Sequence, residues 1–109
     1  MNYDDLQRLA LMLPEAEEKS HFEKPDFRVR DKIFASLKSE RFAVLKLKPE
    51  EQKMVLDSEP DVFSAAPGSW GKQGWTDVFL PDVDEVTLKS TLRMAWKNVA
   101  PKLLFKQLD

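Results

Sequence analysis

The sequence predicts an α+β fold, a two-layer sandwich in which an antiparallel sheet of five to six strands carries helices on one face. Three observations lead to this prediction. Residues 25–48 alternate apolar and polar side chains with the period of two that is typical of strands. Segments with helical spacing of apolar residues lie on both sides of this block. No segment has the composition of a linker or repeats another, so residues 1–109 are expected to form a single domain.

The N-terminal residues predict a helix and an edge strand. Asn2 suits the N-cap of a helix over residues 4–13, and Pro14 disfavours its continuation. The apolar side chains of this helix recur with helical spacing: Leu6, Leu9, Ala10 and Leu13. Residues 17–22 are expected to form an edge strand, with Phe22 as one of its apolar anchors.

Three strands joined by tight turns are predicted at 27–30, 32–38 and 41–47. Strict alternation would assign their side chains to two faces. The face expected to hold the core carries Phe27, Val29, Ile33, Ala35, Leu37, Ala43, Leu45 and Leu47. The outer face would carry Arg28, Arg30, Lys32, Phe34, Lys38, Phe42, Val44, Lys46 and Lys48. A basic face with aromatic residues set into it is unusual for a surface that needs only to be solvated.

The C-terminal half predicts two helices and two strands around a loop. In order, these are a helix at 49–58, a strand at 61–66, a loop at 67–74, a strand at 75–80 and a helix at 84–99. Pro49 is favoured at the first position of a helix, and Asp84 suits an N-cap. In strand 75–80, Trp75 and Asp77 are expected on the face opposite Thr76.

The composition excludes several classes of protein. The chain has no cysteine, which rules out disulfides, thiolate metal sites and a cysteine nucleophile. No apolar run approaches the roughly 20 residues of a membrane span, and the first residues lack the pattern of a signal peptide. We therefore expect a cytoplasmic protein, monomeric and without a membrane partner.

The formal net charge of −2 conceals a strong segregation of charge along the chain. Residues 24–48 carry eight basic and three acidic side chains, and residues 86–109 carry five basic side chains and one acidic one. The remaining segments, 1–23 and 49–85, are acidic. The overall charge argues against indiscriminate binding of nucleic acid, whereas the two basic blocks allow a local positive patch.

Five stretches, in this order and spacing, resemble the MmcQ/YjbR-like family of small bacterial proteins. They are LMLPE at 11–15, PDFRVRDKIFA at 25–35, LKLKPEE at 45–51, GWTDVFL at 74–80 and LRMAWKNVAPK at 92–102. The resemblance implies a CyaY-like (frataxin-like) fold and a DNA-binding protein with a double wing of hairpins. One departure is Arg30–Asp31, where the family often has glycine, so the first hairpin turn is expected to be bulkier and more charged.

The residues suggest a nucleic-acid surface. Arg28, Arg30, Lys32, Lys46 and Lys48 could contact phosphates, and Phe34, Phe42 and Trp75 could stack on the bases of a single strand. On the glycine-rich loop, Trp70 and Lys72 could contact a ligand. The alternative is that the basic side chains cover a solvated face while the aromatic residues pack across strands. The loop could equally be a lid packed on the sheet.

No signal for catalysis is found. The loop lacks the Gly-x4-Gly-Lys-Ser/Thr run of a P-loop, and His21, the sole histidine, has no serine in a nucleophile-elbow pattern. The leading hypothesis is a non-enzymatic DNA-binding protein without a cofactor. One alternative is an adaptor module that docks a protein through Trp70 and Trp75. The other is a small-ligand or metal-binding protein, since acids near the first helix are the counterparts of the acidic ridge of frataxins.

Overall fold

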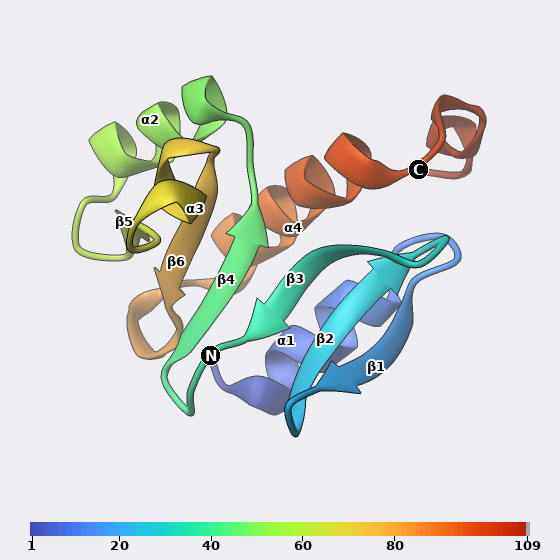
Figure 1. Cartoon of the computed structure of the whole chain (residues 1–109), viewed down its shortest axis with the longest axis horizontal. Coiled ribbons are helices and arrows are strands. Elements are labelled where there is room, and N and C mark those ends of the chain that lie inside the picture. Colours follow the sequence, from blue (N-terminus) through green and yellow to red (C-terminus); the bar gives the residue numbers. More distant parts are fainter. Residues whose placement is uncertain (109) are drawn as a thin grey trace.

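The computed structural model describes residues 1–108 as an α+β sandwich built on a six-stranded antiparallel sheet (Figure 1). The strand order is β1-β2-β3-β4-β6-β5. The strands are β1 (Glu17–His21), β2 (Lys24–Val29), β3 (Lys32–Leu37), β4 (Phe42–Lys46), β5 (Phe63–Ala65) and β6 (Trp75–Phe79). The helices are α1 (Tyr3–Leu11), α2 (Pro49–Ser58), α3 (Ser69–Lys72) and α4 (Glu85–Val99), with the 3₁₀ turns η1 (Leu80–Asp82) and η2 (Lys102–Gln107). The predicted fold class is confirmed.

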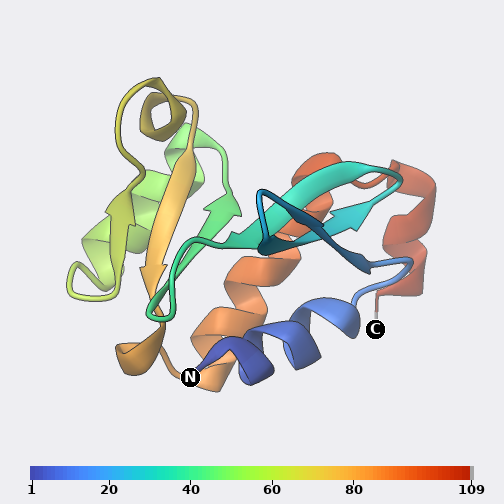
Figure 2. The same ribbon diagram turned by 60° about the horizontal axis from the view of Figure 1, so that its bottom comes forward.

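Helices α1, α2 and α4 lie on one face of the sheet, as the turned view makes clear (Figure 2). Helix α4 packs across β3 and β4 and also contacts α1. Leu88, Leu92 and Trp96 of its apolar stripe are buried, with at most 1% of each exposed. The Trp96 indole nitrogen Nε1 also donates a hydrogen bond to the carbonyl of Pro14, at 3.0 Å. This bond ties the long helix to the segment that follows α1.

The helix starts are set by local caps. The Asn2 side chain accepts a hydrogen bond from the backbone N–H of Asp5, whose carboxylate accepts one from the backbone N–H of Asn2. Asp84 accepts a hydrogen bond from the backbone N–H of Thr87, at 2.7 Å, and this bond lowers the pKa of the Asp84 carboxyl. Because these contacts span only three residues, the sequence alone was sufficient to predict where α1 and α4 begin.

Strand β3 contains one residue more than β2 at their centre. Phe27 lies opposite Ala35 and Arg28 lies opposite Ile33, so Phe34 has no partner in β2. Such a bulge re-aims the side chains around it. Phe34 and Ala35 are both fully buried in the core. The prediction that Phe34 lies on the outer face is therefore wrong, and Ile33, predicted in the core, shares the outer face with Arg28.

Both turns at the hairpins of β1–β3 have two residues with positive φ and no glycine. The pairs are Phe22–Glu23, with φ of 50° and 65°, and Arg30–Asp31, with φ of 52° and 66°. These dihedrals suit the twist of a two-residue hairpin. Phe22 is 94% exposed at the tip of its turn, so its predicted role as an apolar anchor is wrong.

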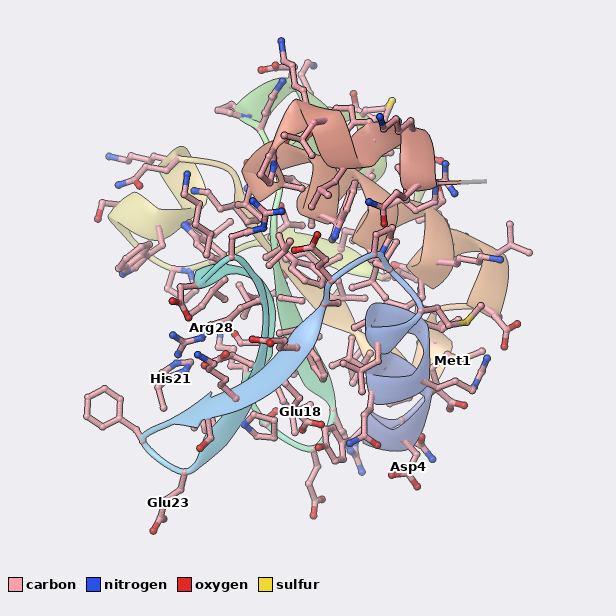
Figure 3. All side chains as sticks on the ribbon, turned by 90° about the vertical axis from the view of Figure 1, so that its right-hand side faces the viewer. Met1, Asp4, Glu18, His21, Glu23 and Arg28 are labelled. Atoms are coloured by element: carbon pink, nitrogen blue, oxygen red, sulfur yellow. The ribbon has the colours of Figure 1, made fainter. Side chains whose placement is uncertain are left out.

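A buried carboxylate connects β1 and β2. Asp26 is fully buried and accepts two hydrogen bonds from the Arg28 guanidinium, at 2.7 and 3.0 Å. His21 Nδ1 lies 2.7 Å from the same carboxylate. His21 and Arg28 project on the same side of this hairpin, whose turn carries Glu23 (Figure 3). The guanidinium first, and the histidine second, lower the pKa of the Asp26 carboxyl.

The bulge yields a prediction about Phe34. Substitution Phe34→Ala should lower the free energy of unfolding in urea by about 3–5 kcal/mol, because it leaves a cavity beneath α4. Phe42→Ala is the matched control, since Phe42 is only half-buried and should cost clearly less. Equal, small losses in the two variants would mean that Phe34 lies on the outer face after all.

The Asp26 cluster yields a prediction about pH. Since the pKa of Asp26 is lower in the folded chain than its ordinary value of 3.8, its stabilisation is complete above that value. This stabilisation is lost as the pH falls below 3.8 and through the lowered pKa that Asp26 has in the folded chain. Measured by urea unfolding, Asp26→Asn should be less stable than the wild type at neutral pH, and the difference should shrink in acid. The control Asp57→Asn, on an exposed pair in α2, should keep the wild-type slope.

Candidate functional site

A cleft with a volume of about 670 Å³ lies on the outer face of the sheet. Helices α1, α2 and α4 cover the opposite face (Figure 2). The cleft lies where β3 and β4 separate, because these strands pair only between residues 35–37 and 43–45. Its apolar walls come from Ile33, Leu37, Val44, Ala66, Pro67, Trp70, Trp75 and Val99. Its polar residues are His21, Lys24, Asp31, Lys32, Ser36, Lys38, Lys46 and Asp77.

The floor of the cleft follows from the strand register. Ser36, Val44 and Asp77 are neighbours across β3, β4 and β6, and therefore share a face. The bulge adds Ile33 to this face, and Val99, at the end of α4, reaches the cleft from the helical layer. The cleft thus combines residues from the sheet with one from the helix beneath it.

Two tryptophans form one wall. Trp70 on α3 is 60% exposed and meets Trp75 on β6 edge to face, with ring centroids 5.9 Å apart and planes at 81°. Lys46 Nζ lies 4.9 Å from the centroid of the Trp75 ring. Cation–π attraction of this kind holds the lysine against the aromatic wall. Trp75 is thereby fixed between two neighbours, whereas most of Trp70 faces solvent.

The loop that carries Trp70 is held by close backbone contacts. A Cβ added to Gly71 would come within 2.0 Å of the Ala66 carbonyl oxygen, and one added to Gly74, where φ is +109°, within 2.0 Å of that of Leu47. The Gln52 side chain of α2 donates to the carbonyls of Gly71 and Trp75, at 3.0 and 2.9 Å. The loop predicted at 67–74 therefore contains a short, anchored helix.

The rim of the cleft is basic. Four lysines line it, Lys24, Lys32, Lys38 and Lys46, against two aspartates. The Lys38 ammonium pairs with Asp77 Oδ2 at 2.7 Å. The other aspartate, Asp31, pairs with Lys19 outside the cleft, and that pair lowers the pKa of the Asp31 carboxyl. The cleft as a whole therefore attracts anions.

The structure brings together four of the ten residues that the sequence singled out. Lys32, Lys46, Trp70 and Trp75 line the cleft, whereas the other six do not: Arg28, Arg30, Phe34, Phe42, Lys48 and Lys72. Phe34 is in the core, and Phe42 packs on Phe79 at 5.2 Å between ring centroids. Lys48 and Lys72 are exposed and do not line the cleft.

Both arginines of the predicted surface are engaged by carboxylates. Arg28 forms its two bonds with Asp26. Arg30 forms two with Glu15, at 2.8 and 3.2 Å, which lowers the pKa of the Glu15 carboxyl. Fork-shaped pairs of this kind satisfy a guanidinium with a carboxylate in place of a phosphate. The single basic face expected from alternation is therefore reduced to the lysine rim.

Sequence reasoning missed Lys24, Lys38 and Asp77 as residues of the site. The alternation in β6 already placed Asp77 beside Trp75, so this aspartate could have been found. Lys24 could not, because the approach of the β1–β2 turn to the cleft depends on the twist of the sheet.

Within residues 1–108, no three His, Asp or Glu side chains are grouped so that they could hold a metal ion. In the same part of the chain, no helix combines the length and apolar character needed to cross a membrane.

Comparison with known proteins supports the fold and the family. The crystal structure of Deinococcus radiodurans protein DR2400, which contains the domain DUF419, is similar with a TM-score of 0.75 and 23% sequence identity. The match covers 96% of this chain and 86% of that chain, and at this identity it shows a shared fold. No curated protein sequence matches the chain significantly. The YjbR family model matches residues 11–98, and the chain therefore belongs to the YjbR family.

Proposed function

We propose that this protein binds single-stranded nucleic acid in the cleft, as a binding protein without a catalytic step, and that DNA is the first ligand to test. The observation that carries the proposal is the exposed Trp70 beside a rim of lysines. Proteins that hold single strands combine a positive groove for the backbone with aromatic side chains on which bases stack.

The lysine rim suits the phosphates of a strand. Lys24 and Lys32 stand on the β1–β3 side of the cleft, and Lys38 and Lys46 stand at the end of β3 and on β4. Lysine binds phosphate as a flexible point charge, so Lys24, Lys32 and Lys46 can adapt to the spacing of a backbone, whereas Lys38 is held by Asp77. Because the whole chain has a net charge of −2, we expect a strand to bind at this basic patch and not over the rest of the surface.

The tryptophan wall favours a single strand over a duplex. Trp70 offers a ring face that only an unstacked base can reach, and such stacking contributes about 1–3 kcal/mol per base. The two arginines that could fork onto duplex phosphates are held by Asp26 and Glu15. The β1–β2 and β2–β3 hairpins contribute one wall of the cleft. In this proposal the double wing of hairpins, which the family resemblance implies, lies beside the bound strand.

The proposal predicts binding that depends on salt and on the lysine rim. A labelled thymidine oligonucleotide titrated at low salt should bind, and Lys32→Glu with Lys46→Glu should weaken binding at least about tenfold. If two phosphate contacts are lost, the slope of log K against log salt should fall by roughly 1.4. Fluorescence anisotropy measures both quantities.

The matched control is Lys53→Glu with Lys102→Glu, which makes the same change in charge at exposed positions outside the cleft. This control should bind nearly as the wild type does. No binding at low salt, or equal losses in the two double variants, would contradict the proposal. Circular dichroism of each variant checks that the fold is retained.

A protein partner is the second candidate, because 60% exposure of a tryptophan at the edge of an apolar wall is also typical of a docking surface. In this case a pull-down treated with nuclease should still recover a partner. Trp70→Ala should lose it, and Trp70→Phe should retain most of it. A partner that disappears with nuclease treatment would mean that nucleic acid bridges the two proteins, which supports nucleic acid as the ligand.

A further inference from the structure

Asp26, Arg28 and His21 form a bonded cluster in the β1–β2 hairpin, at one wall of the cleft (Figure 3). Asp26 is fully buried, whereas the His21 side chain is 42% exposed and lines the cleft. Since Arg28 holds the pKa of the Asp26 carboxyl below its ordinary value, this group is an ionised acceptor. His21 Nδ1, 2.7 Å away, therefore donates its hydrogen to the carboxylate.

This hydrogen bond decides what the rest of the imidazole ring can do. With Nδ1 bonded to Asp26, Nε2 is the ring nitrogen that remains for a ligand or for water. In the neutral ring Nε2 accepts a hydrogen bond, and in the protonated ring it carries a hydrogen and donates one. Only the protonated ring therefore suits a phosphate oxygen.

Protonation of His21 also changes the charge of this wall. The Arg28 guanidinium already balances the Asp26 carboxylate, so a neutral imidazole leaves the cluster without net charge. A protonated imidazole gives the cluster one positive charge. Because His21 lines the cleft, this charge acts on the same ligand as the lysine rim.

The other charged groups near His21 come from β1, β2 and the two hairpin turns. They are Lys19, Glu23, Lys24, Asp31 and Lys32. Asp31 is paired with Lys19, and Glu23 is exposed at its turn, where water and salt screen its charge. On the other face of β1, Glu18 is bonded to Tyr3 of α1. A protonated His21 therefore adds its charge to those of Lys24, its neighbour across the strands, and Lys32.

We propose that His21, in its protonated form, is a binding residue of the cleft, so that the cleft holds polyanions more tightly in mild acid than at neutral pH. A histidine ring gains its proton as the pH falls from about 8 to 5, whereas lysine and arginine keep their charge over this range. The inference rests on the proposed function, and it names a residue through which pH would regulate binding of the strand.

The first test is the affinity for a thymidine oligonucleotide that has no terminal phosphate. At constant ionic strength, the wild type should bind it about three- to fivefold more tightly at about pH 5.5 than at about pH 7.5, as expected for one half-exposed ion pair. The slope of log K against log salt should be steeper by roughly 0.7 in acid, because one more phosphate is contacted. Fluorescence anisotropy measures both quantities.

Two variants assign the effect to His21. His21→Gln removes the titrating ring and keeps a side-chain N–H, so it should bind the strand equally at the two pH values. His21→Lys carries a fixed charge and should bind more tightly than His21→Gln at both. The matched control is Lys24→Gln, which should weaken binding at both pH values and keep the wild-type response to pH. Circular dichroism checks the fold of each variant.

A second readout comes from the ring itself. Because His21 is the sole histidine, the Cε1–H resonance of its imidazole can be followed by proton NMR without ambiguity. A ligand that prefers the protonated ring must, by linkage, favour its protonation. The midpoint of the His21 titration should therefore move to higher pH when the strand is added. A purely structural histidine would titrate alike with and without the strand.

The outcomes separate this inference from the proposed function. If strands bind with salt dependence, but equally at both pH values or with the wild-type pH response in His21→Gln, the role of His21 is wrong and the strand proposal stands. If no strand binds but dextran sulfate moves the His21 titration to higher pH, the role of His21 stands and the ligand is another polyanion. If neither polymer binds, both are overturned.

Discussion

The extra residue in β3 decides which side chains of the central sheet meet the core and which meet the cleft. Phe34 has no partner in β2 and turns inward beside Ala35, so α4 packs on a fully buried aromatic ring. Ile33 turns outward in exchange and becomes part of the cleft wall. One extra residue in a strand reverses the face of every side chain on one side of the bulge, because side chains alternate with a period of two. The separation of β3 from β4, which opens the cleft, adjoins the same bulge.

The basic block of the sequence is divided by the chemistry of its side chains. Arg28 and Arg30 each form a two-bond pair with a nearby carboxylate, Asp26 and Glu15. The guanidinium matches a carboxylate in shape, whereas the lysine ammonium is a compact charge on a flexible chain. Consequently the arginines stabilise the hairpins, and the lysines remain at the rim of the cleft. The basic block therefore contains two arginines with a structural role and several lysines that are candidates for binding a ligand.

Strand β6 connects the stability of the fold with the candidate site. Thr76 and Val78 face inward and are fully buried, and alternation then directs Trp75 and Asp77 into the cleft. The tryptophan and aspartate therefore sit on a rigid strand, while Trp70 sits on a loop that Gly71 and Gly74 hold against neighbouring backbone. A strand that is anchored on one face can hold unpaired polar atoms on the other, because the core offsets their cost.

The sequence by itself determined the elements whose signals are local. Asn2 and Asp84 cap their helices within three residues, Pro49 begins α2, and the alternation of β6 assigned Trp75 and Asp77 to one face. The order of motifs also indicated the family that the YjbR model then matched.

Only the tertiary structure decided the position of Phe34, the pairing of the arginines and the assembly of the cleft. The bulge depends on how β3 fits between β2 and α4, and nothing in residues 32–37 marks it, because Phe34 and Ile33 are both apolar. The ion pair of Arg30 joins residues 15 positions apart, and that of Lys38 joins residues 39 apart. Contacts over such separations arise from the folding of the whole sheet, so a periodic pattern within one strand does not contain them.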